Sequence, residues 1–171
     1  MKLFWKKKSS KLTLDEITFE IKNFQNEKVK SVLKEIGINA LDEYGRTALI
    51  WASFAENIDL ITWLFENKAE VNHQDVNGYC ALHFAAQERK TESTKYLLNQ
   101  NAETELKDKH LNTPLWTAVM SARNNFSVVE LLLKNGANLD NLNKVEKTPR
   151  EMAETIFGLE FEDLKRKLNI K

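Results

Sequence analysis

Hydrophobic side chains recur along this chain at helical spacing, in paired segments that are separated by polar, turn-forming residues. The first segment of a pair, residues 48–54, is short and rich in small side chains. The second segment carries bulkier apolar residues, in three successive copies: Ile58, Ile61, Leu64 and Phe65, then Tyr96, Leu97 and Leu98, then Val128, Val129, Leu131, Leu132 and Leu133. This spacing predicts pairs of helices. Because one pair cannot bury its own apolar face, neighbouring pairs must stack.

The paired segments repeat with a period of 33 residues. The same residue types occur at this separation in two successive copies: Asp42, Gly45, Leu49, Ala52, Leu64 and Ala69 recur as Asp75, Gly78, Leu82, Ala85, Leu97 and Ala102. A third copy keeps the register with Asp108, Thr113, Leu115 and Ala118, and then reaches Leu132 and Ala137 two residues late. This delay places an insertion near residues 123–127. A fixed period of this length indicates a repeat solenoid.

The repeat pattern predicts one domain over residues 12–171, preceded by a basic tail at residues 1–11. We interpret this tail as a plain terminus rather than as an anchor to a membrane surface or to a partner through Phe4 and Trp5. The domain divides into an N-terminal capping repeat (12–40), three repeats (41–73, 74–106 and 107–141, the last with the two-residue insertion) and a C-terminal capping repeat (142–171). Residues 156–171 are predicted to form one amphipathic helix that closes the stack, with its apolar side formed by Phe157, Leu159, Phe161, Leu164 and Leu168.

Helix boundaries carry their own signals. Thr47, Thr113 and Thr148 stand where a helix needs a side-chain oxygen to cap its free backbone N–H groups. Proline follows two of these threonines, at Pro114 and Pro149. This is the first helical position, where the backbone N–H that proline lacks would make no hydrogen bond within the helix. Gly136 is placed to end a helix in the left-handed conformation.

Composition narrows the classes of partner. Lys+Arg and Asp+Glu number 25 each, so no net field draws the chain to nucleic acid or to a membrane, and we expect neither as a partner. The contents of 42% hydrophobic and 29% charged residues are those of a folded globular protein. Cys80 is the only cysteine, which excludes an intramolecular disulfide and fits a reducing compartment. We therefore expect a cytoplasmic protein, and a monomer.

One stretch, Asp42 to Ala52, reads DEYGRTALIWA and resembles the D-x-x-G-x-T-P-L-H-x-A opening of the ankyrin repeats. Residues 75–86 are similar to it and retain a histidine, His83; residues 113–116 (TPLW) and 131–138 (LLLKNGAN) extend the resemblance to roughly residues 14–155. The resemblance implies an all-α ankyrin-repeat solenoid of helix-turn-helix units joined by β-hairpin-like turns. Leu111 and Glu146 replace the turn glycine and Cys80 replaces the capping threonine, so we expect reshaped turns there.

Ankyrin repeats are protein-binding scaffolds that use their turn tips and the concave row of first helices, so the resemblance implies a protein partner. Carried over position by position, the predicted partner-binding residues are Glu43, Tyr44, Arg46, Phe54, Val76, Asn77, Tyr79, Gln87, Glu88, Lys109, His110, Asn112, Met120 and Arg123. Tyr44 and Tyr79, which we interpret as equivalent positions in successive repeats, favour a partner face over scattered surface residues. Trp51 and Trp116 are expected to pack between repeats.

Enzymatic and metal-binding alternatives have few residues to draw on. A zinc site would have to gather nearly all of His73, His83, His110 and Cys80, and the resemblance implies a structural hydrogen bond for His83 instead. A nucleophile at Cys80 would need a lowered pKa at the helix N-terminus, and neither a base nor an oxyanion hole is evident. The sequence therefore predicts no catalytic residues, no metal and no cofactor, with a Cys80-based enzyme as the minor alternative.

The kind of partner is suggested by the third repeat. With its two-residue extension between helices, residues 113–125 look like small stand-alone bacterial ankyrin proteins, some of which act as immunity proteins for toxins. Blocking a toxin needs only a tight, complementary surface. The predicted function is therefore stoichiometric protein binding, with a cognate toxin as the specific hypothesis and an adaptor or inhibitor of an endogenous cytoplasmic enzyme as its alternative.

Overall fold

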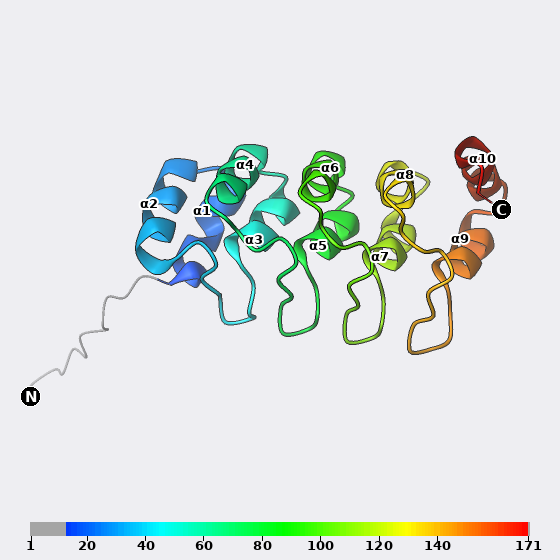
Figure 1. Ribbon diagram of the computed structural model, residues 1–171, viewed down its shortest axis with the longest axis horizontal. Coiled ribbons are helices and arrows are strands. Elements are labelled where there is room, and N and C mark those ends of the chain that lie inside the picture. Colours follow the sequence, from blue (N-terminus) through cyan, green and yellow to red (C-terminus); the bar gives the residue numbers. More distant parts are fainter. Residues whose placement is uncertain (1–12, 171) are drawn as a thin grey trace, which may run out of the picture.

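Two rows of helices run along the long axis of the molecule, and extended turns project from one side of it (Figure 1). The structure is a computed structural model that describes residues 13–170. The row next to the turns, here called the inner row, contains α1 (Thr18–Lys22), α3 (Ala48–Ala55), α5 (Ala81–Gln87), α7 (Pro114–Ser121) and α9 (Pro149–Phe157). The outer row contains α2 (Asn26–Ile36), α4 (Ile58–Glu66), α6 (Thr91–Asn99), α8 (Ser127–Lys134) and α10 (Leu159–Leu168). A 3₁₀ helix, η1 (Leu14–Ile17), precedes α1.

Each inner helix packs against the next inner helix, from α1 through α9, and α4, α6 and α8 stack in the same way. No strand occurs among residues 13–170, where the extended pairing consists of one isolated antiparallel bridge between Gln74 and Cys80. The predicted all-α solenoid of stacked helix pairs is confirmed. The predicted basic tail, with Phe4 and Trp5, lies outside the described residues.

The inner helices begin where the sequence predicts. The hydroxyl oxygens of Thr47, Thr113 and Thr148 accept hydrogen bonds from the backbone N–H three residues on, at 3.3, 3.3 and 3.1 Å. Pro114 and Pro149 occupy the first helical positions. Each cap satisfies a backbone donor that would otherwise have no partner within the helix.

The core lies between the two rows and repeats with the sequence. Alanines at the same position of four inner helices, Ala52, Ala85, Ala118 and Ala153, are all at most 2% exposed. Their small side chains let neighbouring inner helices approach closely. In the outer row Leu64, Leu97 and Leu132 are fully buried at equivalent positions, so every repeat depends on its neighbours for burial.

The C-terminal end differs from its prediction. The single helix expected over residues 156–171 is divided, because Phe157 ends α9 and Gly158, with φ of +49°, turns the chain before α10. Leu159 is 78% exposed and contributes nothing to the core, whereas Phe161 and Leu164 are buried as expected. The predicted insertion falls in the connection between α7 and α8, where Arg123 and Asn124 have positive φ.

Candidate functional site

Four turns of the same design project from the inner row, and each is organised by one side chain. The first residue of each turn accepts hydrogen bonds through its Oδ1 from the backbone N–H groups two and four residues later, at distances from 2.7 to 3.1 Å; these residues are Asp42, Asp75, Asp108 and Asn143. The two short side-chain bonds close the turn without help from a strand. Aspartate in this position is therefore structural in all three full repeats.

The tips of the turns are joined to one another along the molecule. The backbone N–H of Val76 donates to the carbonyl of Tyr44 at 3.0 Å, and Lys109 donates to Asn77 at 2.9 Å. The third link, from Lys144 to His110, is also 2.9 Å. This ladder fixes the spacing of the tips, so side chains of successive repeats are presented as one continuous edge.

Two turns lack the expected glycine and nevertheless keep this shape. Leu111 and Glu146 adopt φ of +61° and +56°, and their N–H groups donate to the carbonyls of Asp108 and Asn143 at 2.9 and 3.1 Å, as Gly78 does to Asp75. Our expectation of reshaped turns was wrong. The side-chain bonds and the ladder between tips hold the left-handed conformation against its steric cost.

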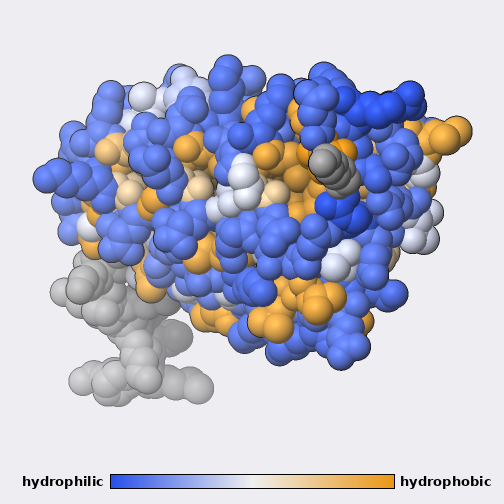
Figure 2. All heavy atoms as spheres, turned by 45° about the vertical axis from the view of Figure 1, so that its right-hand side comes forward, coloured by the Kyte–Doolittle hydropathy of each residue, from blue (hydrophilic) through white to orange (hydrophobic). Residues whose placement is uncertain are grey.

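Apolar side chains are exposed along this edge. Tyr44, Val76, Leu111 and Val145, one in each turn, are 50%, 53%, 40% and 70% exposed. Figure 2 shows hydrophobic residues gathered along the lower side of the molecule, where the turns lie in Figure 1. Apolar groups placed at the tips of a rigid edge are typical of a surface that another molecule covers.

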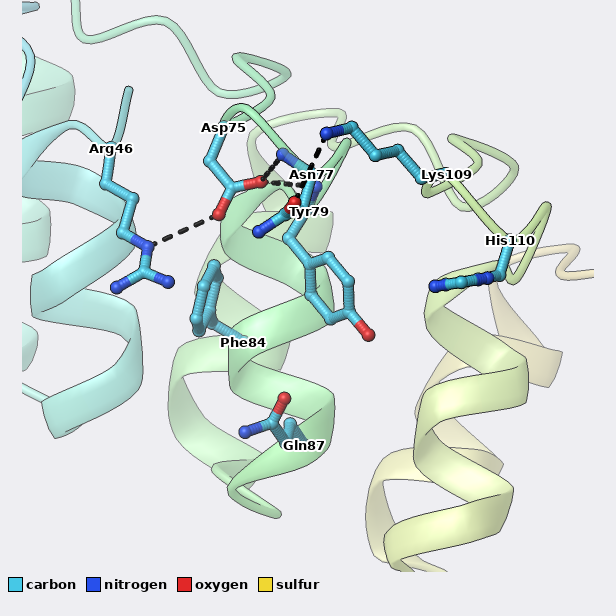
Figure 3. Close-up of a pocket in the computed structure, with 8 residues that line it drawn as sticks. All are labelled: Arg46, Asp75, Asn77, Tyr79, Phe84, Gln87, Lys109 and His110. Carbon is cyan, nitrogen blue, oxygen red and sulfur yellow. Dashed lines mark hydrogen bonds and ion pairs between the residues drawn. The ribbon is translucent and has the colours of Figure 1, made fainter. Parts of the chain in front are cut away.

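A hollow of about 440 Å³ opens between the first three turns and α5 (Figure 3). It is lined by Arg46, Asp75, Asn77, Tyr79, Phe84, Gln87, Lys109 and His110. Sequence reasoning named six of these as partner-binding residues. It missed Asp75 and Phe84, although Asp75 belongs to the recurring turn position and Phe84 lies next to the retained histidine in the sequence. The hollow draws on three successive repeats, so it exists only in the stacked structure.

An ion pair crosses the first two repeats at the wall of the hollow. Arg46 Nε lies 3.3 Å from Asp75 Oδ2, and the Asp75 side chain is only 1% exposed. The Arg46 guanidinium also lies 5.0 to 5.1 Å from the ring centres of Tyr44, Trp51 and Phe84. The aromatic rings and the carboxylate restrict the guanidinium to one position, which prepares it for a planar ligand.

Four aromatic side chains form a row along the inner helices: Trp51, Phe54, Phe84 and Tyr79. Their successive ring centres are 5.9, 6.5 and 5.6 Å apart. Trp51 packs against the core, as expected, and its Nε1 donates a hydrogen bond to Asp42 Oδ2 at 2.8 Å. Trp116, on α7, is half-buried. Lys22 Nζ lies 4.1 Å above the Trp51 ring. The aromatic row is thus continuous with the hollow and has a cation at its far end.

The two tyrosines do not occupy equivalent positions. Tyr44 precedes the turn glycine and aligns with Asn77 and His110, whereas Tyr79 follows the glycine and aligns with Arg46. Tyr44 is half exposed, whereas Tyr79 packs on Phe84. Burial and the nearby Asp108 carboxylate raise the pKa of Tyr79. Our interpretation of Tyr44 and Tyr79 as equivalent was therefore wrong, because positions are equivalent only when they are 33 residues apart.

The other predicted partner-binding residues lie at different places. Gln87 and Met120 are exposed at the same position of α5 and α7, and Phe54 occupies that position on α3. Glu43 is exposed beside Tyr44, whereas Glu88 and Arg123 lie at or beyond the other ends of the inner helices.

Asn112, predicted to contact a partner, also bonds to residues of neighbouring repeats. Its Nδ2 donates to Asp108 Oδ2 at 3.2 Å, and its Oδ1 accepts from Asn143 Nδ2 at 3.0 Å. Its backbone carbonyl accepts from His83 Nε2 at 3.1 Å. These bonds join α5 to the third turn and the third turn to the fourth, so Asn112 acts inside the framework that supports the hollow.

Cys80 and His83 form a buried pair at the start of α5. The Asn112 carbonyl can only accept a hydrogen bond, so His83 Nε2 carries the proton. His83 Nδ1 therefore accepts a hydrogen bond from the Cys80 N–H at 3.3 Å, and Cys80 Sγ lies 3.1 Å from the same nitrogen. Burial lowers the pKa of His83 and raises the pKa of Cys80 to about 11. A nucleophile at Cys80 would need a lowered thiol pKa, and burial raises this pKa instead, because desolvation outweighs the effect of the helix N-terminus.

The comparisons with known proteins agree with this geometry. The sequence profile of the ankyrin repeats, in three copies, matches residues 53–143, which is more than half of the chain. This chain belongs to the ankyrin repeat family. Ankyrin repeats are protein–protein interaction modules and are generally not enzymes.

Relatives of this ankyrin repeat protein occur in viruses and in animals. An ankyrin repeat protein of fowlpox virus is 28% identical in an alignment of 153 residues that covers 72% of this chain and 24% of that protein. An ankyrin repeat domain-containing protein of monkeypox virus is 52% identical over 48 residues, 28% of this chain and 11% of the relative. Dog inversin is 37% identical over 87 residues, 48% of this chain and 8% of inversin. The chain thus spans a quarter or less of the length of these relatives.

Two further properties of the ankyrin repeat protein concern only residues 13–170. Within them, no group of three or more His, Cys, Asp and Glu side chains is arranged to hold a metal ion. No helix in the same part of the chain has the length and apolar character needed to cross a membrane.

Proposed function

We propose that this ankyrin repeat protein binds a partner protein stoichiometrically through its inner face, which comprises the inner helices and the turn tips. The hollow carries the proposal, because side chains from three successive repeats line it together (Figure 3). The ladder between tips and the capped helices hold these side chains in position before a partner arrives. A preorganised surface loses little conformational entropy on binding, which favours affinity.

The residue types on this face also support a protein partner. Arginine and aromatic side chains contribute most of the binding energy in protein interfaces, and here Arg46 lies against the aromatic row. The exposed apolar tips extend the face beyond the hollow, and Met120, 49% exposed on α7, extends it along the helices. Polar residues such as Gln87 and Lys109 surround this apolar centre.

Neutralisation of a cognate toxin is the specific form of this function that we propose, and inhibition of an endogenous enzyme is its alternative. Either needs only a complementary surface that covers the partner's own site. We further propose that the protein acts as a monomer in the cytoplasm, since its lone cysteine is buried and free, as fits a reducing compartment. Binding by a monomer gives a 1:1 complex, which sedimentation or light scattering measures directly.

A photo-crosslinking amino acid placed at single positions tests the proposed face. At Gln87 on α5 the crosslinker would lie in the hollow, and at Lys95 on α6 it would lie on the exposed outer row. In cells that express the protein naturally, we expect one dominant crosslinked product from position 87 and none from position 95. Equal capture at both positions, or capture only at position 95, would refute the inner-face assignment.

The identity of the crosslinked partner decides between the two roles. If the partner is a toxin, co-expression of the wild-type chain should restore growth to cells that produce this toxin. The variant Gln87→Arg with Met120→Arg should not restore growth, because both substitutions place bulk and charge on exposed positions of the inner face. Rescue by that variant would contradict neutralisation through this face, and an endogenous enzyme as the captured protein would support the alternative.

A further inference from the structure

The carboxylates near the hollow are already used by the protein itself. Asp75 accepts two backbone N–H bonds and the Arg46 Nε–H, and Asp42 accepts two backbone N–H bonds and the indole N–H of Trp51. Both side chains are buried. Glu43 and Glu88 do not line the hollow. A ligand that enters the hollow therefore meets few carboxylate oxygens with free acceptor capacity.

The cations at the hollow are placed differently. Arg46 is held by the Asp75 carboxylate through Nε, and its two terminal nitrogens point away from Asp75, one of them toward Phe84 (Figure 3). Lys109 lies on the opposite wall, where its side chain is exposed and its contact is a 3.4 Å bond to Asn77 Oδ1. His110 stands next to Lys109 and is also exposed. The positively charged donors that a ligand can reach in the hollow are therefore Arg46 and Lys109.

The aromatic row lies between and beyond these cations. Phe84 and Tyr79 line the hollow, and Phe54 and Trp51 continue the row toward Lys22, whose Nζ lies 4.1 Å from the Trp51 ring centre. Cations thus occur at both ends of an apolar strip. A ligand complementary to this strip has carboxylates spaced along it with apolar groups between them.

We propose that the hollow and the aromatic row recognise an extended acidic segment of the partner protein, in which Asp or Glu side chains alternate with apolar ones. Arg46 binds one carboxylate through its terminal nitrogens, and Lys109 binds another across the hollow. The apolar side chains of the segment pack on Phe84 and Tyr79. This inference rests on the proposed function and adds to it the chemistry of the segment that is bound. A nucleic acid is disfavoured, because a phosphate chain carries a charge at every residue and the hollow offers only a few cations.

Selection from a library of random peptides of about 12 residues, displayed on phage against the full chain, tests the proposal. We expect the selected peptides to be enriched in Asp and Glu adjacent to apolar residues. A synthetic peptide of the selected sequence should lose about tenfold or more in affinity with Lys109→Gln, and similarly with Arg46→Gln. Lys109→Gln is the primary variant, since Lys109 is exposed and its substitution leaves the Asp75 ion pair in place.

The matched control removes charge elsewhere. Lys34→Gln with Lys95→Gln lowers the net charge by two on exposed positions of α2 and α6, and affinity should stay within about twofold. Raising NaCl from about 50 mM to about 500 mM should weaken binding to the wild type and have much less effect on the Lys109→Gln variant.

The outcomes separate this inference from the function on which it rests. Selected peptides that are neutral or basic, but lose binding with Gln87→Arg plus Met120→Arg, would overturn the acidic-segment inference and leave inner-face binding intact. Neutral or basic peptides that bind that double variant equally well, or a failure to select any, would overturn both. Binding of a single-stranded oligothymidine that competes with the peptide would replace the acidic segment with a nucleic acid.

Discussion

Substituting Gly78 by alanine tests whether contact between neighbouring turns stabilises the solenoid. Gly78 has φ of +83°, and a Cβ at this position would lie 2.9 Å from the Cα of Asp108 and 3.1 Å from the carbonyl oxygen of Lys107. Both are backbone atoms of the next turn, which cannot move aside as a flexible side chain could. Gly136 provides a matched control, because its φ is +85° and a Cβ there has no atom within 4 Å.

The expected losses follow from these two environments. At Gly136 the left-handed conformation costs an alanine about 1–2 kcal/mol, and the reduced entropy of the unfolded chain returns about 0.4–1 kcal/mol, so the net loss is about 1 kcal/mol. At Gly78 the third turn must also move to relieve the 2.9 Å contact. That movement disturbs the Lys109 N–H bond to Asn77 and the Gln74 bond to the Lys107 carbonyl, which contribute about 1 kcal/mol each.

We therefore expect Gly78→Ala to lower the free energy of unfolding by about 3 kcal/mol and Gly136→Ala by about 1 kcal/mol. Urea unfolding followed by circular dichroism and by tryptophan fluorescence measures both values. For a chain of this size, about 3 kcal/mol corresponds to a fall of about 6–12 °C in Tm. Equal losses for the two variants would show that the turns are not held against each other, and would remove the ladder between tips as a source of stability.

Three more predictions concern buried polar groups. Burial lowers the pKa of His83 below 6.5, the value in the unfolded chain. The buried neutral imidazole therefore stabilises the fold above pH 6.5. This stabilisation is lost as the pH falls below 6.5, because the unfolded chain then binds a proton that the folded chain does not. The urea concentration at the midpoint of unfolding should decrease for the wild type as the pH is lowered from about 6.5 to about 5. The His83→Gln variant should be less stable than the wild type at pH 7, but its midpoint should decrease less over this pH range. Cys80 has a pKa raised to about 11 from 9.0, so its stabilising effect is present below pH 9 and is lost as pH rises toward 11. At pH 8 a thiol reagent should label Cys80 only at the rate of unfolding, and rapid labelling of the native chain would contradict its burial. Asn57, fully buried, caps α4 and bonds to Asn26 and the Ile21 carbonyl, so Asn57→Ala should cost about 3 kcal/mol of unfolding free energy. A loss below about 1 kcal/mol in the same urea assay would contradict its role in joining the N-terminal helices to the first full repeat.

Several features of the candidate site were predicted in part. The period of 33 residues placed Arg46, Tyr79 and Lys109 on one face, because the repeat fixes which positions point away from the core. It did not indicate Phe84, which looks like a core residue in the sequence and is one in the structure, 7% exposed, but also lines the hollow. It also made Asn112 look available to a partner, whereas its side chain bonds to the neighbouring turns.

The sequence by itself determined the helix pairs, their capping residues and their stacking order. These depend on local signals, such as Thr47 as an N-cap and apolar residues at helical spacing, which act within a few residues along the chain. The tertiary structure alone decided the shape of the turn at Leu111, the pKa of Cys80 and the joining of Arg46 to Asp75. Each depends on groups about one repeat away in the sequence, whose approach and desolvation arise only when the repeats stack.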